Sequence, residues 1–270
     1  MKRRSFKTIL REAWDDLAGT VRNADLVFLL GQQDLVLRYR RSVLGPFWIT
    51  ISMGIMIGAL GVVFGQIFST AIGEFLPFLA VGMILWNLLS SAIIEGCNAF
   101  TSNQGMITQL ALPMGLYIFR GIWREFLFFL HNIIILPLVF LVMGKGITWV
   151  ALAGIPGLCL FMLNVSWMVI LASIICTRYR DLPQLVNSIL QVTFYITPVM
   201  WMPQLLPKRA GLFLLDLNPA FHLLEIVRAP LLGQFPTLLN WEVSLSLAVL
   251  GWSVALYFLG RYRGRVAYWL

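Results

Sequence analysis

The sequence predicts an all-α integral membrane protein that crosses the membrane six times. The chain of 270 residues is 59% hydrophobic and only 12% charged, whereas soluble proteins average about 45–50% apolar and about 25% charged residues. The charged residues cluster and leave six uncharged windows, each near or above the ~20 residues with which a helix crosses a ~30 Å hydrocarbon core. These windows are 42–73, 75–94, 126–144, 146–177, 182–207 and 243–260. Continuous apolar runs argue against a β-barrel, whose strands show ~10-residue alternating segments.

The predicted organisation is a single transmembrane domain over residues 1–270. A cytoplasmic amphipathic region, 1–47, precedes a six-helix membrane region, 48–260, and a cytoplasmic tail, 261–270, follows it. The membrane helices are predicted at residues 48–68, 76–95, 125–143, 149–175, 183–202 and 242–260.

Both termini are predicted to be cytoplasmic, because cytoplasmic loops carry an excess of Lys and Arg. If successive loops alternate sides, sixteen of the 20 Lys and Arg residues lie on the side of the termini and four on the other. This bias explains most of the net charge of +8, so a nucleic-acid partner is not expected.

The N-terminal region is predicted to contain two helices. Six apolar residues recur at helical spacing on one face of the first helix: Phe6, Ile9, Leu10, Ala13, Trp14 and Leu17. This helix is expected to lie on the cytoplasmic membrane surface or to pack against a partner. A second helix, 23–42, brings three arginines to the edge of the bilayer. Gly45-Pro46 ends it, because the residue before a proline avoids helical geometry.

Two connecting segments are too polar to cross the membrane. Segment 96–124 is expected on the cytoplasmic side, with a short helix that ends before Pro113. Segment 203–241 is apolar but is interrupted by charges and prolines, so we expect it to lie in the outer interface or to re-enter the membrane. Within it, Glu225 and Arg228 have the i, i+3 spacing of a surface helix pair; the alternative is a lid over a transport pathway.

Several chemical functions lack their motifs. The chain contains no G-x-x-x-x-G-K-[ST] phosphate loop, so we do not expect it to hydrolyse ATP by itself. His131 and His222 are the only histidines and lack a zinc-ligand spacing. Three cysteines without a C-x-x-C pair predict neither a disulfide nor a metal site. Acidic residues are nearly absent from the predicted spans, which argues against a proton- or sodium-coupled carrier. Something else must therefore supply the energy for any transport.

Four segments resemble one family of membrane proteins. They are "RYRRSVLGPFW" (38–48), "RYRDLPQLVNSILQVTFYITPVMW" (178–201), "NPAFHLLEIVRAPLLG" (218–233) and "RYRGRVAYWL" (261–270). In order and spacing they are similar to the permease subunit of ABC-2 type polysaccharide exporters, the Wzm-type proteins of O-antigen, capsule and teichoic acid export. The resemblance implies a homodimer in the bacterial cytoplasmic (inner) membrane, with two copies of a separate nucleotide-binding ATPase. It also implies an undecaprenyl-type, lipid-diphosphate-linked glycan as cargo. ATP and Mg are expected on the partner, and no cofactor on this chain.

Aromatic residues near spans one and five are candidates for the lining of a glycan pathway. Aromatic rings offer a sugar chain large contact areas with polar tips. The resemblance places these two spans at the channel of the dimer. The candidates are Phe47, Trp48, Phe64, Phe68, Phe194, Tyr195 and Trp201. Individually, each of them also fits the aromatic belt at the membrane interface or a lipid contact.

Basic and amphipathic residues before the first span suggest two further sites. Arg38, Arg40 and Arg41 can bind a lipid diphosphate or headgroup through their guanidinium groups, or they only anchor the chain to membrane lipids. Contacts with the ATPase are expected from the first helix and from segment 98–112. The residues chosen for this role are Phe6, Leu10, Trp14, Leu17, Asn103 and Ile107. Glu95 either pairs with a basic residue or contacts the ATPase.

The residues leave three rival functions open. An ABC-2 permease for a drug or another small lipid has the same architecture. A membrane-embedded acyl- or glycosyltransferase would need a set of acid/base or metal-binding residues, which the few polar residues of the spans do not form. A scaffold without transport activity fits the composition but not the order of the four segments.

Overall fold

The computed structural model describes residues 5–40, 42–45, 47–146, 148–205 and 215–270. Over these residues the chain forms helices and no strands. The elements, in order, are α1 (Phe6–Arg22), α2 (Ala24–Tyr39), α3 (Phe47–Ile67), α4 (Ile72–Asn98), the 3-10 turn η1 (Thr101–Asn103), α5 (Gln104–Gln109), α6 (Met114–Asn132), α7 (Ile135–Val142), η2 (Trp149–Ala153), α8 (Gly154–Arg178), α9 (Leu182–Ile196), η3 (Pro203–Leu205), α11 (Pro219–Leu231) and α12 (Leu238–Trp269). The predicted all-α class is confirmed.

Five stretches of the described chain are long and apolar enough to cross a membrane. They are Phe47–Ile67, Ile72–Asn98, Met114–Val142, Trp149–Arg178 and Leu238–Trp269. Each overlaps one predicted span. The fifth predicted span, 183–202, forms the 15-residue helix α9, which is about 22 Å long at 1.5 Å per residue and so shorter than a ~30 Å hydrocarbon core. The structure therefore supports a helical membrane bundle with five spans of sufficient length.

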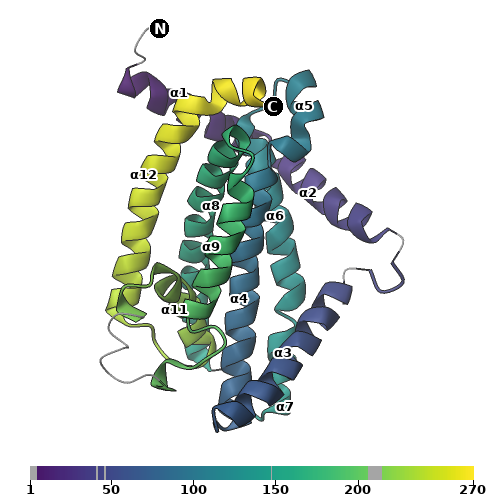
Figure 1. Ribbon diagram of the computed structural model, residues 1–270, viewed down its shortest axis with the longest axis vertical. Coiled ribbons are helices and arrows are strands. Elements are labelled where there is room, and N and C mark those ends of the chain that lie inside the picture. Colours follow the sequence, from purple (N-terminus) through teal and green to yellow (C-terminus); the bar gives the residue numbers. More distant parts are fainter. Residues whose placement is uncertain (1–4, 41, 46, 147, 206–214) are drawn as a thin grey trace.

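Helices α4 and α8 form the centre of the bundle. α8 packs along both α12 and α4, and α9 runs beside α4 and α8 (Figure 1). In the apolar stretch of α4, 72% of the residues are buried, against 11% in α3. No residue of α9 is buried. Consequently α3 and α9 each present a largely uncovered apolar surface.

The two ends of the bundle differ. The start of α1, the end of α12 and the short helix α5 lie at one end, called here the terminal end (Figure 1). The opposite end, called the far end, holds α7, α11 and the turn between α3 and α4. At the terminal end, α2 extends sideways from the bundle, and α3 leans away from it on the same side.

Helices α1, α2 and α5 occupy the stretches of the terminal end in which helices were predicted, but several boundaries differ from the predicted ones. α2 ends at Tyr39, ahead of Gly45; Pro46 lies outside the described residues. α5 ends at Gln109, before Pro113, as the short helix of segment 96–124 was expected to do. The third span was predicted to start at residue 125, but α6 starts at Met114. Arg120 and Arg124, which were assigned to a loop, are therefore part of this helix.

Candidate functional site: a partly buried charge network at the terminal end

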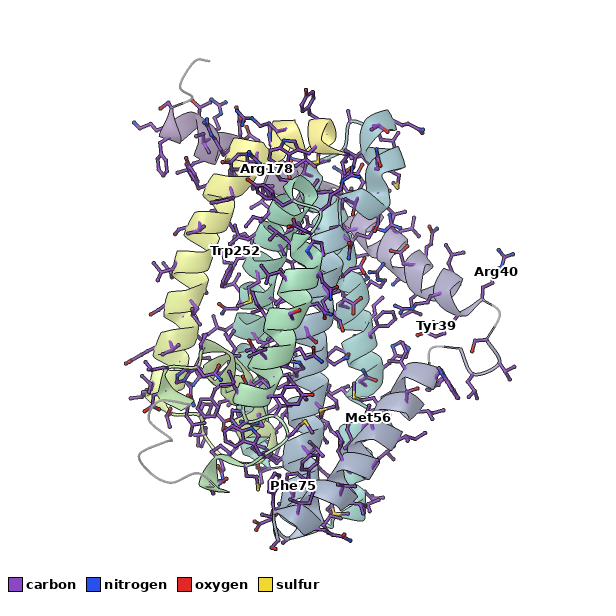
Figure 2. All side chains as sticks on the ribbon, viewed as in Figure 1. Tyr39, Arg40, Met56, Phe75, Arg178 and Trp252 are labelled. Atoms are coloured by element: carbon purple, nitrogen blue, oxygen red, sulfur yellow. The ribbon has the colours of Figure 1, made fainter. Side chains whose placement is uncertain are left out.

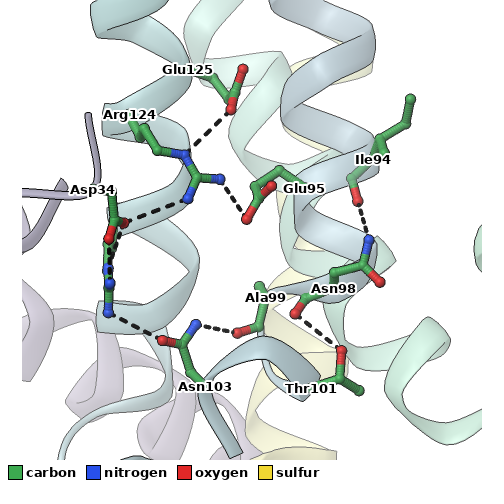
Figure 3. A network of polar contacts seen from close by, with 10 residues as sticks. Asp34, Ile94, Glu95, Asn98, Ala99, Thr101, Asn103, Arg124 and Glu125 are labelled. Atoms are coloured by element: carbon green, nitrogen blue, oxygen red, sulfur yellow. Dashed lines mark hydrogen bonds and ion pairs between the residues drawn. The ribbon is translucent and has the colours of Figure 1, made fainter. Parts of the chain in front are cut away.

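A network of charged side chains joins α2, α4 and α6 near the terminal end (Figure 3). Its centre is Arg124 of α6. The Arg124 Nη2 atom lies 2.5 Å from Glu95 Oε1 of α4, and Nη1 lies 3.5 Å from Asp34 Oδ2 of α2. Glu125 is also within 3.5 Å of the same guanidinium group. One arginine thus contacts carboxylates from three helices.

Arg120, one turn earlier on α6, extends the network toward α5. Its Nε and Nη2 atoms donate to the two carboxylate oxygens of Asp34 at 2.8 and 2.5 Å. This is the bidentate geometry that suits a guanidinium–carboxylate pair. The Arg120 Nη1 atom donates to Asn103 Oδ1 at 3.1 Å, and Asn103 Nδ2 donates to the Ala99 carbonyl at 2.7 Å. The segment between α4 and α6 is therefore tied to α2 through Arg120.

A second set of contacts fastens α1 to the same end of α6. Asp16 of α1 accepts hydrogen bonds from the backbone N–H groups of Met114 and Gly115, at 3.0 and 2.8 Å. A carboxylate at a helix N-terminus satisfies free N–H groups and interacts favourably with the helix dipole. Arg263 of α12 lies 3.7 Å from Asp16 and donates to the Glu12 carbonyl at 2.7 Å. Asp16 thus links α1 to both α6 and α12.

The close packing of α1 on α12 depends on a glycine. A Cβ atom at Gly260 would collide with the backbone carbonyl of Ile9. Ile9 and Ala13 are buried in this contact. The helix predicted for the amphipathic stretch is therefore present, and part of its apolar face packs on this chain.

The residues proposed for contact with an ATPase fall into two groups. On α1, Phe6 and Trp14 are 62% and 68% exposed, while Leu10 and Leu17 are half-buried. They follow one another along the side of α1 next to the buried face. The other two residues lie between α4 and α6, where Asn103 belongs to the charge network and Ile107 is buried in the core. Their role in coupling stays a prediction.

A separate polar cluster holds α11 at the far end. Arg228 is 1% exposed and donates to Glu225 Oε2 from both Nε and Nη2, at 2.9 and 2.5 Å. It also donates to the Pro198 carbonyl at 2.5 Å, and its guanidinium carbon lies 4.0 Å from the ring centre of Phe78. The predicted Glu225–Arg228 pair is confirmed, but its description as a surface pair is wrong, because Arg228 is buried against α4 and the end of α9.

Further contacts fix the start and the middle of α11. Asn218 caps the helix and donates to Thr197 Oγ1 at 2.9 Å. His222 contacts Asn240 of α12 at 2.7 Å. On the face toward α8, a Cβ atom at Gly157 would collide with the Ile226 backbone. α11 is therefore packed into the bundle and does not lie loosely on it.

The predicted pathway aromatics are not brought together within one chain. Phe47, Trp48, Phe64 and Phe68 belong to α3 or directly follow it, and α3 packs on α4 and α6. Phe194 and Tyr195 belong to α9, and Trp201 donates to the Tyr195 carbonyl at 3.1 Å. Phe194 contacts Trp86 of α4, with ring centres 5.5 Å apart. The two groups thus lie on the uncovered helices α3 and α9 or in the residues that follow them, and their place in a pathway stays a prediction.

The three candidate arginines for a diphosphate or headgroup do not form one described site. The guanidinium group of Arg38 lies over the ring of Phe128 on α6, 5.3 Å from its centre. Arg40 lies at the end of α2 and points away from the bundle (Figure 2). Arg41 lies outside the described residues.

The sequence analysis missed most of the charge network. Asp34 was not singled out, and Arg120 and Arg124 were counted only as charges of a loop. Only the pairing of Glu95 with a basic residue was considered, and this pairing is confirmed by the contact with Arg124. Among the described residues, no group of three or more His, Cys, Asp or Glu side chains is placed to hold a metal ion.

Comparison with known proteins identifies the family. Residues 25–232, from α2 to the end of α11, match the ABC-2 type transporter family. The chain belongs to this family. An O-antigen export system permease protein RfbA from Klebsiella pneumoniae is 25% identical to it over 201 residues, 72% of this chain and 75% of the relative. A protein of the same name from Myxococcus xanthus is 25% identical over 206 residues, 76% of this chain and 79% of the relative.

Membership of the ABC-2 type transporter family assigns this helical bundle to the membrane part of a transporter. An ABC-2 membrane protein is the permease of an ABC transporter, so an ATPase partner is implied. The charge network and the far-end cluster both lie inside the matched range. α1 and α12 lie outside it, yet Asp16 and Arg263 connect them to α6. Polar contacts join α1, α2, α4, α6 and α12 at the terminal end.

Proposed function

We propose that this chain is the permease of an ATP-driven exporter that moves a lipid-diphosphate-linked polysaccharide across the bacterial inner membrane. The observation that carries the proposal is the likeness to O-antigen export permeases over about three quarters of the chain. The four sequence segments noted above point to the same cargo. ATP and Mg bind to the partner ATPase in this proposal, and both termini of the permease are cytoplasmic.

The uncovered helices support a homodimer. α9 has no buried residue, although it is apolar, and α3 is nearly as exposed. A second copy that covers α9, or lies near it, would place the aromatic residues of α3 and α9 around a shared path. Rings such as Phe194 and Tyr195 would hold a sugar chain through large contact areas without fixing its register.

The terminal end suits contact with the ATPase. Trp14 is a large, exposed aromatic residue on a helix that Asp16 anchors to α6, and such residues often dominate protein interfaces. Arg120 connects Asn103 to α2. A displacement of α1 or of the α5 segment would therefore be passed to α6 through direct polar contacts.

Deletion of the gene, followed by complementation, tests the cargo. Loss of this chain should abolish the surface polysaccharide and leave glycan on its lipid carrier inside the cell, and the wild-type chain should restore export. A strain that keeps normal surface glycan after deletion, but loses resistance to a small molecule, would refute the polysaccharide cargo and favour a drug permease.

Cysteine cross-linking tests the dimer. Val192 on α9 is 58% exposed. In a chain whose three native cysteines are replaced by serine, Val192→Cys should form a cross-linked dimer in native membranes with a short bifunctional reagent. Leu250→Cys on α12, which is also exposed, is the matched control and should remain monomeric. Equal cross-linking at both positions would refute a specific contact near α9.

A further inference from the structure

An apolar groove of about 880 Å³ lies where α1 meets α2, on a side of the bundle formed by α6, α8 and α12. The charge network and the exposed faces of α3 and α9 do not contribute to it. Its walls include Trp14 and Leu17 of α1, Trp123 of α6, Met162 of α8 and Trp252 of α12. Small-molecule sites usually have volumes of about 300–1,000 Å³, so the groove is large enough for part of a lipid.

The walls of this groove offer almost nothing to water. The Thr20 hydroxyl already donates to the Asp16 carbonyl at 2.9 Å. Trp252, which points from α12 toward the bundle (Figure 2), donates its indole N–H to the Leu163 carbonyl at 2.9 Å. A groove of this size with apolar walls is unfavourable when filled with water. Because α6, α8 and α12 belong to segments of spanning length, hydrocarbon from the membrane is available to fill it.

The rim of the groove carries one charge. Arg22 is the only charged residue in the lining, and it is exposed. Among the described residues, no hydrogen bond or ion pair occupies its guanidinium group. Arginine binds phosphate oxygens through parallel N–H groups. Three tryptophans, Trp14, Trp123 and Trp252, line the same groove, and tryptophan concentrates at the level of lipid headgroups.

We propose that this groove binds an acidic phospholipid of the membrane, with an acyl chain along the tryptophan-lined walls and the phosphate at Arg22. The bound lipid fills the space beneath the α1–α2 junction and so supports the position of both helices. The site does not require the cargo to be a polysaccharide. A failure of the lipid test would therefore leave the proposed transport function standing, and the reverse also holds.

Native mass spectrometry of the full-length chain tests this site. The purified protein, stripped of lipid in detergent, is titrated with phosphatidylglycerol and, separately, with phosphatidylcholine of the same acyl chains. The wild type should bind one phosphatidylglycerol molecule more tightly than phosphatidylcholine. Arg22→Gln should reduce this preference by about fivefold, the effect expected for one basic residue near an anionic headgroup.

Two further variants separate the headgroup contact from general effects. Arg11→Gln makes the same charge change on α1, but Arg11 is not part of the groove; it should bind like the wild type. Ala18→Trp fills the groove and should abolish binding of both lipids. If the Ala18→Trp chain does not fold, the Arg22→Gln variant still tests the headgroup contact.

Three outcomes would overturn the proposal. The wild type could bind both lipids equally, or Arg22→Gln could keep the full preference for phosphatidylglycerol. Undecaprenyl phosphate at equal concentration could displace phosphatidylglycerol from the wild type and fail to bind the Ala18→Trp variant. That last result would assign the groove to a lipid carrier instead of a structural phospholipid.

Discussion

Asp34→Asn tests the charge network directly. The substitution keeps the size of the side chain but removes the charge that faces Arg120 and, at 3.5 Å, Arg124. Two unit charges about 4 Å apart attract by about 4 kcal/mol at an effective dielectric constant of about 20, and breaking a buried pair costs about 3–5 kcal/mol. The side chains of Arg120 and Asp34 are 17% and 15% exposed. Arg120 keeps its hydrogen bond to Asn103 in this variant. We therefore expect the free energy of unfolding to fall by an amount near the lower bound, about 3 kcal/mol.

Thermal unfolding of the purified chain in detergent, followed by tryptophan fluorescence, measures this loss. At about 2–4 °C per kcal/mol for a chain of roughly this size, Asp34→Asn should lower the Tm by roughly 6–12 °C. Asp25→Asn is the matched control, since Asp25 is exposed on the first turn of the same helix. A double-mutant cycle with Arg120→Met isolates the pair. The reasoning is refuted if Asp34→Asn and Asp25→Asn have the same Tm. It is also refuted if the destabilisations caused by Asp34→Asn and Arg120→Met are additive in the double mutant.

Three other substitutions probe contacts elsewhere, each read by Tm or proteolysis. Gly157→Leu drives a side chain into the α11 backbone and should lower the free energy of unfolding by about 1–3 kcal/mol. Gly54→Leu, at an open position of α3, is the control and should leave the Tm unchanged. Equal losses of Tm in the two variants would contradict the close approach of α8 and α11. Arg228→Lys loses the double hydrogen bond to the carboxylate and should cost about 1.5–3 kcal/mol; an unchanged Tm would show that this bond adds no stability. Gly260→Leu should displace α1, so that limited proteolysis removes the N-terminal segment; wild-type protease resistance would mean that α1 is not docked there.

The helical membrane class and the positions of most elements follow from composition alone. An apolar run long enough to cross the bilayer must satisfy its backbone internally, so it becomes a helix. The fifth run is different. Its uncharged window reaches residue 207, but α9 ends at Ile196, and Thr197 and Pro198 instead take part in contacts with Asn218 and Arg228. Apolar composition could not show that tertiary polar contacts hold the chain in a non-helical path there.

The candidate site was harder to predict, because its members are far apart in sequence. Asp34 and Arg120 are 86 residues apart, and each alone is an ordinary charge at the edge of an apolar run. The predicted spans were limited to uncharged windows, so Arg120 and Arg124 were assigned to the end of a loop. Their carboxylate partners allow both arginines to lie inside α6. One local signal was available: arginines at i and i+4 place two guanidinium groups on one face of a helix, which predicts a shared anionic partner.

The distribution of polar contacts separates the parts of the bundle that are held firmly from those that are held weakly. α6 is joined to α1, α2 and α4 by charged or hydrogen-bonded side chains. In contrast, α3 makes one described side-chain hydrogen bond to another helix, from Thr50 to the His131 carbonyl at 3.0 Å. Regions with few buried contacts open at low cost. In the proposed transport function, we therefore expect the path to widen by movement of α3 or α9 away from α4. We expect α1, α2 and α6 to move together with the partner at the terminal end.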